Sequence, residues 1–465
     1  MRLDLDTICR QINGELMGDN RVVVNGISTD SRLISPGSLF VALKGENFDG
    51  HDYVAQAFAK GAAAAVVERN ETWTPESLRG KGLIKVPDTL LGLQKIAACW
   101  RTNFAIPLIA ITGSVGKTTT KDLIASCLGI TYNTLKTQGN YNNDIGLPLT
   151  LLRLNEEHQA AVVEMAMRQR GEIGRLSRLA KPTVAVIINA EPVHLETLGT
   201  IENIIRAKCE ILEGLAKEGF ALVNGDNPEL VKIARSLCSR VLTFGQEPSC
   251  DYQIVKAEAD IQGMTISARL IDHQMDFQML LPSLRLAHNV IAAVAVAHQL
   301  GLGYEAIKKG IAKFSPTGNR LNIIKTSQGG LVINDTYNAN PVSMANALET
   351  AHQLDNENRL VAVLGDMFEL GSFETEGHLK VGEKAALCNP KALIAIGERA
   401  KIIAQGAIQA GMPREQVFWC HSKEEGLKVL INLANAKDIV LFKASRGMQM
   451  ETLAQEWIRR NNGEA

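Results

Sequence analysis

The sequence predicts an α/β protein of three domains, and three observations support this prediction. Apolar runs rich in β-branched residues alternate with helical segments along nearly the whole chain, which is typical of mostly parallel sheets covered by helices. The 465 residues are too many for one hydrophobic core and suggest about three domains of ~150 residues each. A strand followed at once by Gly-Ser-Val-Gly-Lys-Thr (113–118) predicts a phosphate-binding loop in the middle of the chain.

We expect the domain boundaries near residues 85 and 313. The smaller N-terminal α/β domain, 1–85, has predicted strands at 37–43 and 64–67. The central domain, 86–313, is predicted to be a phosphate-loop ATPase with a mostly parallel sheet. Its strands are expected at 107–111, 160–164 and 184–189, and a long apolar helix at 284–300. The C-terminal domain, 314–465, is predicted to be Rossmann-like, with strands at 331–335, 360–365, 392–397 and 438–443.

Composition excludes several classes of protein. A net charge of −1 provides no basic field, so nucleic acid is not an expected partner. The eight cysteines form no C-x-x-C pair, which favours reduced thiols over disulfides or a zinc site. The start of the chain has no apolar segment like that of a signal peptide, and polar residues interrupt the apolar helix at 284–300. We therefore expect a cytoplasmic monomer that acts on small molecules, with no membrane span.

The phosphate-binding loop carries most of the functional information. Gly113 and Gly116 allow a tight turn that points backbone amides at phosphate oxygens. Lys117 supplies a charge for the β- and γ-phosphates, and the hydroxyl of Thr118 can bind magnesium. A chance glycine turn is the alternative, but the strand before the loop and the helix after it favour ATP with Mg²⁺. The residues expected to bind the nucleotide here are Gly113, Ser114, Val115, Gly116, Lys117, Thr118 and Thr119.

Polar residues that follow predicted strands are further candidates, because ligands bind at the carboxyl ends of strands in open α/β sheets. Glu164 ends an apolar run and could hold magnesium, or it could be a solvated carboxylate. His194 follows another run, where a lone loop histidine usually has no function. The amide-rich loop 137–148 suits either a polar ligand or a plain turn. Segments 334–341 and 364–371 follow strands in the same way and are expected to face a cleft.

Taken in order, these segments resemble the Mur ligase family over essentially the whole chain. Residues 29–32, 39–45 and 49–52 are similar to the family's UDP-binding domain, and 112–119 to its phosphate loop. Residues 139–146 and 335–341 are similar to its diagnostic segments. The resemblance implies that ATP phosphorylates the terminal carboxylate of a UDP-N-acetylmuramoyl-tripeptide. D-alanyl-D-alanine then attacks the acyl phosphate, giving the UDP-linked pentapeptide, ADP and phosphate for peptidoglycan synthesis, and so for cell wall biogenesis, cell shape and cell division.

The resemblance also implies roles for individual residues. Glu164 and His194 match magnesium-binding positions, and Lys208 matches a lysine that is carbamylated in several members. The alternative for Lys208 is a solvated helix lysine. The implied catalytic residues are Lys117, Glu164, His194, Lys208 and Arg320, and the implied metal ligands are Thr118, Glu164, His194 and Lys208. The implied nucleotide contacts beyond the loop are Asn289, Arg320, Asp335, Tyr337 and Asn338. The implied substrate contacts are Ser31, Arg32, Lys44, Gly45, His51, Asn140, Asn142, Asn143 and Asn340.

Departures from the family pattern and rival classes complete the expectations. Leu286 and Ala292 stand where glycine and asparagine are common, which affects the adenine contacts more than the phosphate chemistry. The C-terminal domain lacks the Asp-Asn-Pro-Arg of the sibling that adds the third amino acid, and the chain lacks the Asn-Lys-x-Asp of a GTPase switch. A sister amide ligase, such as a folylpolyglutamate synthase, is the alternative. Segment 443–448 is similar to a family segment whose role is either structural or substrate-facing.

Overall fold

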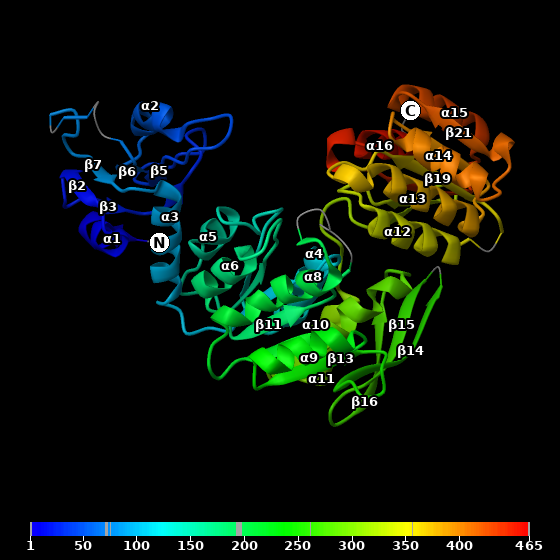
Figure 1. The fold of residues 1–465 in the computed structure, drawn as a ribbon, viewed down its shortest axis with the longest axis horizontal. Helices are drawn as coiled ribbons and strands as arrows, with labels where there is room; N and C mark the ends of the chain where they lie inside the picture. Colours follow the sequence, from blue (N-terminus) through cyan, green and yellow to red (C-terminus); the bar gives the residue numbers. More distant parts are fainter. Residues whose placement is uncertain are drawn as a thin grey trace. The chain divides into compact units, whose positions relative to one another are not determined.

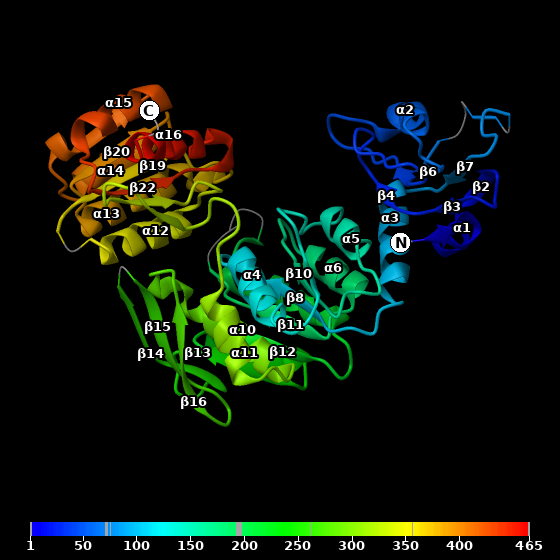
Figure 2. The ribbon, with the colours of Figure 1, turned by 180° about the vertical axis from the view of Figure 1, so that it is seen from behind.

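The computed structural model describes residues 2–69, 73–74, 76–191, 198–260, 262–355 and 357–463. Two compact units emerge from the contacts within the chain. The first holds residues up to Glu191 together with Thr200–Thr243 and Gln299–Leu302, and the second holds Phe244–His298 and Gly303–Ala465. Figures 1 and 2 show strands covered by helices in both units. The predicted α/β class is confirmed.

The N-terminal part of the first unit is a five-stranded sheet in the order β2-β7-β6-β5-β4. Its strands are β2 (Glu15–Gly18), β4 (Ile27–Ser28), β5 (Leu39–Val41), β6 (Ala64–Val67) and β7 (Gly82–Lys85), and β1 (Leu3–Asp4) pairs separately with β3 (Val23–Val24). The helices are α1 (Leu5–Ile12), α2 (Val54–Ala59) and α3 (Thr89–Arg101). Leu5 and Ile8 of α1 share one buried core with Leu93 and Ile96 of α3, because each helix turns an apolar face to the sheet.

The first unit also contains five parallel strands in the order β12-β11-β8-β10-β9. They are β8 (Leu108–Thr112), β9 (Thr134–Lys136), β10 (Ala160–Glu164), β11 (Val184–Ile187) and β12 (Phe220–Asn224). Strands β8, β10 and β11 are buried along their whole length, as expected for parallel strands covered on both faces. The helices of this part are α4 (Lys117–Leu128), α5 (Gly146–Leu151), α6 (Glu172–Ala180), α8 (Ile201–Cys209) and α9 (Pro228–Leu237).

The second unit begins with an antiparallel ladder, β14 (Tyr252–Asp260), β15 (Gly263–Arg269) and β16 (Gln274–Met279). The last residues of β13 (Val241–Gly245) pair with β14 in parallel. The helix predicted at 284–300 begins as a 3₁₀ turn, Leu284–Leu286, and continues as α10 (Ala287–Gln299), with α11 (Tyr304–Ala312) after it. No helix in the described ranges is both long and apolar enough to cross a membrane.

The C-terminal sheet has six strands in the order β17-β18-β22-β19-β20-β21, and only β17 runs antiparallel to its neighbour. The strands are β17 (Asn322–Lys325), β18 (Leu331–Asn334), β19 (Leu360–Gly365), β20 (Ala392–Ile396), β21 (Val417–Cys420) and β22 (Ile439–Lys443). The helices are α12 (Pro341–Gln353), α13 (Glu374–Cys388), α14 (Ala400–Gln409), α15 (Lys423–Leu433) and α16 (Glu451–Asn461).

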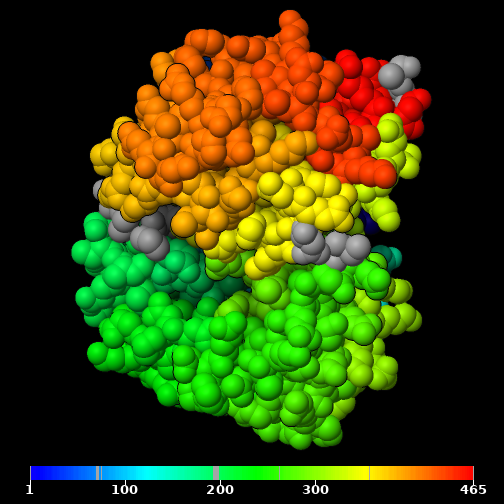
Figure 3. Space-filling view, turned by 90° about the vertical axis from the view of Figure 1, so that its right-hand side faces the viewer, coloured from blue at the N-terminus to red at the C-terminus, as the bar shows by residue number. Residues whose placement is uncertain are grey.

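Two separate cores lie on the two faces of this sheet. One joins Leu348 of α12 and Ile403 of α14 to Leu364 of β19, and the other joins Trp457 of α16 to Phe442 of β22. In Figure 3 the segments from α13 to α15, coloured amber to orange, form much of the surface of this part that faces the viewer. Helices on both faces of a mostly parallel sheet make this part Rossmann-like, as predicted.

Candidate active site

The phosphate-binding loop connects β8 to α4 in the way that the sequence predicts. Gly116 has a φ of 84°, in the left-handed region that favours glycine, and α4 begins at Lys117 directly after it. Nζ of Lys117 donates hydrogen bonds to the carbonyl oxygens of Gly113 (2.7 Å) and Ser114 (3.2 Å), so its ammonium lies across the loop. The first turn of a helix presents backbone amides and the positive end of the helix dipole. The loop therefore has the geometry of an anion site.

Asn189 holds the phosphate-binding loop in place, and sequence analysis did not single it out. Its Oδ1 accepts hydrogen bonds from the backbone N of Ser114 (2.8 Å) and of Val115 (3.1 Å), and its Nδ2 donates to O of Val115 (3.1 Å). The amides of Ser114 and Val115, which we expected to contact phosphate, thus point at a protein side chain. The available signal was the position of Asn189, a polar residue just after a buried strand.

Glu164 lies beside the loop because β10 runs parallel to β8, with Glu164 opposite Ile111. The residue is 3% exposed, so the alternative of a solvated carboxylate is wrong. One oxygen accepts a hydrogen bond from Oγ1 of Thr118 (2.9 Å) and the other from Nδ2 of Asn142 (2.8 Å). The backbone N of Glu164 donates to Oγ1 of Thr137 (3.0 Å). The structure thus brings together three residues that the sequence predicted separately.

Lys208 is buried near the end of α8, with 2% of its surface exposed, so the alternative of a solvated helix lysine is wrong. Burial, and after it the positive charge of Lys117, hold the pKa of Lys208 well below its usual range. Both effects disfavour the charged ammonium. Burial lowers the pKa of the equally buried Lys121 as well, but there the charge of Asp122, 3.3 Å away, opposes the shift, and O of Thr137 accepts its hydrogen bond.

The oxygen atoms of Thr118 and Glu164 are of the kind that binds a magnesium ion. Mg²⁺ is usually bound through one or two carboxylates and keeps several waters. The hydroxyl of Thr118 and the carboxylate of Glu164 are both oxygen donors, 2.9 Å apart, at the start of a helix that favours phosphate. Within the described ranges no three His, Cys, Asp or Glu side chains gather as a metal site. The expected ligand His194 lies in 192–197, outside the described residues.

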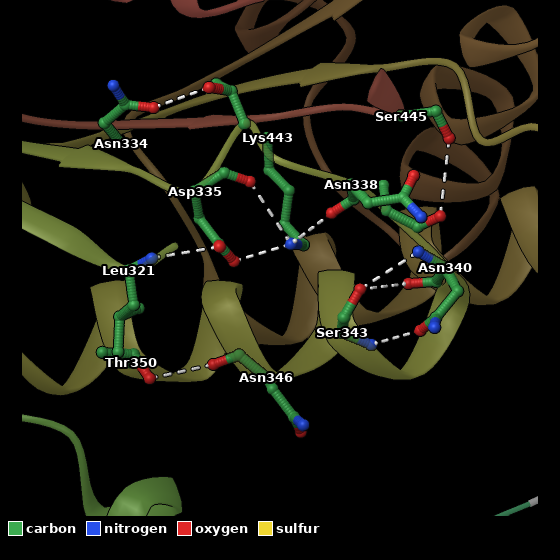
Figure 4. A network of polar contacts seen from close by, with 12 residues as sticks. Leu321, Asn334, Asp335, Asn338, Asn340, Ser343, Asn346, Thr350, Lys443 and Ser445 are labelled. Carbon is green, nitrogen blue, oxygen red and sulfur yellow. Dashed lines mark hydrogen bonds and ion pairs between the residues drawn. The ribbon is translucent and has the colours of Figure 1, made fainter. Parts of the chain in front are cut away.

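A second group of predicted site residues lies at the carboxyl ends of β18 and β22, in the second unit (Figure 4). Oδ2 of Asp335 lies 2.6 Å from Nζ of Lys443, the last residue of β22. The guanidinium carbon of Arg320 lies 3.7 Å from the ring centroid of Tyr337, the distance of a cation–π contact. The side chain of Asn338 accepts a hydrogen bond from the backbone N of Arg446 (3.4 Å). Asn289, expected at adenine, is buried in α10 of the same unit.

Of two expected substrate residues, Asn340 caps a helix and Asn143 holds the turn before another. Oδ1 of Asn340 accepts a hydrogen bond from N of Ser343 (2.8 Å) and begins α12 with a capping box. Oδ1 of Asn143 accepts from N of Gly146 (2.9 Å) at the start of α5. In the amide-rich loop Asn143 thus forms a turn, and the side chain of Asn142 donates to Glu164. Asn140 is exposed in this loop.

The expected UDP-binding residues lie in the N-terminal sheet and its loops, where several are engaged with the protein itself. Both ring nitrogens of His51 are occupied, Nδ1 by Asp49 (2.5 Å) and Nε2 by the backbone N of Glu68 (2.8 Å). His51 thus fixes the loop that contains it. The exposed Arg32 pairs with Asp30 and lowers the pKa of that carboxyl to about 2. The remaining members of the set are Ser31, which donates to Gln56, and Lys44 and Gly45 in the loop before Asp49.

Comparison with known proteins agrees with this site. Three family models match in succession: "Mur ligase family, catalytic domain" over residues 23–98, "Mur ligase middle domain" over 111–297 and "Mur ligase, glutamate ligase domain" over 319–446. The UDP-N-acetylmuramoyl-tripeptide–D-alanyl-D-alanine ligase of Bacillus subtilis (strain 168) is 37% identical over 453 residues, which are 97% of each chain. The chain belongs to the Mur ligase family.

Solved structures of Mur ligases are similar to this chain over nearly its whole length. A crystal structure of MurF from Acinetobacter baumannii superposes with a TM-score of 0.89 at 32% identity, covering 99% of both chains. A crystal structure of MurF ligase from Thermotoga maritima in complex with ADP superposes with a TM-score of 0.84 at 27% identity, covering 95% of this chain and 99% of the other.

Replacing Asn189 by alanine tests its role in holding the loop. The substitution removes the acceptor of the Val115 amide and leaves the Ser114 amide only the backbone O of Asn189, 3.3 Å away. We therefore expect kcat/KM for ATP to fall about 10- to 100-fold, from the ~1–3 kcal/mol that an unsatisfied donor costs. The measurement is ATP-dependent ADP release. Asn227→Ala is a matched control, because Asn227 caps α9 through N of Leu230 (3.0 Å) and has no bond to the loop. Unchanged kinetics in Asn189→Ala, or equal losses in both variants, would contradict this role.

Proposed function

We propose that this chain is an ATP-dependent ligase that joins D-alanyl-D-alanine to UDP-N-acetylmuramoyl-tripeptide, the activity in the name of its Bacillus subtilis relative. The observation that carries the proposal is a full-length match that includes a complete phosphate-binding loop with a buried carboxylate beside it. The product is the UDP-linked pentapeptide used in peptidoglycan synthesis, with ADP and phosphate released.

The proposed chemistry has two steps. A carboxylate is a poor acyl donor, so the terminal carboxylate of the tripeptide first attacks the γ-phosphorus of ATP and becomes an acyl phosphate. The amine of D-alanyl-D-alanine then attacks the acyl carbon and phosphate leaves. Phosphoryl transfer gains mainly from positioning and from neutralising spread negative charge. Lys117, the first turn of α4 and Arg320 are the groups of this chain that we assign to that task.

We assign the magnesium site to Thr118 and Glu164, with His194 and Lys208 as the further ligands that the family resemblance implies. When bound, magnesium neutralises charge on the β- and γ-phosphate oxygens and orients them. Asn142 orients the carboxylate of Glu164, and Thr137 fixes its backbone. These contacts hold the carboxylate in one direction before the nucleotide arrives.

The remaining assignments follow the sequence predictions. We assign the nucleotide to Asn289, Arg320, Asp335, Tyr337 and Asn338 together with the phosphate-binding loop. We assign the UDP-tripeptide and dipeptide to Ser31, Arg32, Lys44, Gly45, His51, Asn140, Asn142, Asn143 and Asn340. The three domains proposed are 1–85, 86–313 and 314–465, a division that the three successive family matches support. A monomer in the cytoplasm remains part of the proposal.

Lys208 is proposed to work as a carbamate. The nitrogen of a neutral lysine attacks the carbon of carbon dioxide, an N–C bond forms, and one proton is released, leaving an anionic carboxylate-like ligand. The lowered pKa of Lys208 supports this step, because only the unprotonated amine is a nucleophile. A bare ammonium beside Lys117 and a magnesium ion would be repelled, whereas the carbamate would be attracted.

The substrate assignment predicts which mixture releases ADP. We expect rapid ADP release with UDP-N-acetylmuramoyl-tripeptide and D-alanyl-D-alanine together, and little when the dipeptide is replaced by single amino acids. Equal rates with D-glutamate or a diamino acid would move the assignment to a sister ligase.

Lys117→Ala should lower turnover at least 100-fold, since a phosphate-directed charge in a water-poor site contributes several kcal/mol, about 3 or more. Lys217→Ala, at an exposed position of the same unit, should change it less than twofold.

The carbamate assignment predicts chemical rescue. Lys208→Ala should be nearly inactive and should regain part of its turnover in high concentrations of acetate or formate, whose carboxylate can occupy the vacated position. Lys121→Ala serves as the comparison, because it empties a buried lysine site whose ammonium is already paired and should not respond to carboxylates. Full activity of Lys208→Ala, or equal responses of both variants to acetate, would rule the carbamate out.

A further inference from the structure

Lys443 is a fully buried lysine at the carboxyl end of β22, with 2% of its surface exposed. Its ammonium has three acceptors: Oδ2 of Asp335 at 2.6 Å, O of Asn338 at 3.0 Å and O of Asp335 at 3.4 Å. An ammonium can donate three hydrogen bonds, so all of its donors are used. Figure 4 shows the side chain of Lys443 reaching between Asp335 and Asn338. Its partners belong to a segment more than a hundred residues earlier in the chain, 335–338.

The other oxygen of Asp335 holds a strained backbone position. Its Oδ1 accepts a hydrogen bond from the backbone N of Leu321 (3.0 Å). Leu321 has a φ of 45°, in the left-handed region that a branched aliphatic residue rarely adopts. Such a conformation persists only where surrounding contacts enforce it. Asp335 supplies that contact, and Lys443 holds Asp335.

Arg320 lies between two residues whose backbones are fixed to the same segment. On one side, O of Asn319 accepts a hydrogen bond from N of Tyr337 (3.0 Å). On the other, N of Leu321 donates to Asp335. The Arg320 guanidinium then lies on the ring of Tyr337, 3.7 Å from its centroid. The direction of the arginine is therefore set by the turn at Leu321 and by the aromatic ring below it.

We propose that Lys443 is a positioning residue for Arg320, acting through Asp335 and the left-handed turn at Leu321. Because the ammonium fixes one carboxylate oxygen, the other is directed at N of Leu321, and Arg320 is held ready on Tyr337. This proposal rests on the proposed function, in which Arg320 meets the nucleotide phosphates. It gives the segment 443–448 a role in orientation.

The test compares Lys443→Met with a control variant, Lys391→Met, whose carboxylate partner lies at the other end of β22. Nζ of Lys391 lies 2.7 Å from Oδ2 of Asp438, which is 4% exposed and immediately precedes β22. Lys391→Met thus breaks a second lysine–aspartate pair of this sheet, at the amino ends of its strands. Both variants are expected to lower the thermal unfolding midpoint. Only Lys443→Met is expected to affect Arg320.

Kinetics and backbone exchange give separate readouts. Lys443→Met should lower kcat for ADP release 10- to 100-fold, and less than threefold further when Arg320 is already alanine, because coupled residues are not additive. Lys391→Met should change kcat less than twofold. By hydrogen–deuterium exchange mass spectrometry, the amide of Leu321 should exchange at least tenfold faster in Lys443→Met than in the wild type or Lys391→Met.

Several results would overturn the proposal: the same fold-loss in kcat with and without Arg320, an equal loss in Lys391→Met, or unchanged exchange at Leu321. If Lys443→Met does not fold, the double variant Lys443→Met/Asp335→Asn removes both charges. It should show intermediate exchange at Leu321, and wild-type exchange there would overturn the proposal. If the wild type releases no ADP with both substrates, the proposed function fails, and the exchange measurement still decides the role of Lys443 because it needs no substrate.

Discussion

The parallel register of β10, β8 and β11 is the constraint on which the site depends. Glu164 lies opposite Ile111 and Ile187 opposite Thr112, so the carboxyl ends of the three strands reach one edge together. A slip of one residue would turn Glu164 to the opposite face of the sheet. With this register, the same edge carries the phosphate-binding loop, its brace Asn189 and a buried carboxylate. The proposed chemistry of the chain depends on that alignment.

The lysines of this protein differ in their burial and in the groups that surround their side-chain nitrogens. Lys117 lies across the loop carbonyls, where a charge is useful to an incoming phosphate. Lys121 and Lys443 are buried but paired with carboxylates, which offsets the cost of removing an ammonium from water. Burial and the positive charge of Lys117 lower the pKa of Lys208. Among the described residues, neighbouring side chains therefore decide which of the buried lysines are paired with a carboxylate and which is not.

Sequence patterns predicted the elements of this fold well and the contacts between them poorly. The alternation of strands and helices, the phosphate-binding loop and Glu164 at a strand end could all be predicted, because each depends on residues close in sequence. Asn189 could not, since its partners are decided by β11 pairing with β8. The hydrogen bond between Nε2 of His51 and the backbone N of Glu68 could not be predicted either, because the two residues are far apart in sequence. The predicted helix at 284–300 begins as a 3₁₀ turn, a detail that apolar periodicity does not distinguish.

Calorimetric titration of ATP, with and without magnesium, into the wild type and Glu164→Gln tests most directly whether the aligned strand ends form a magnesium-nucleotide site. Magnesium should raise the ATP affinity of the wild type at least tenfold. Glu164→Gln should bind ATP alone as the wild type does but lose most of the gain from magnesium, because the substitution removes the charge and keeps the size of the side chain. An equal magnesium-dependent gain in both proteins would contradict the assignment of Glu164 and the site built around it.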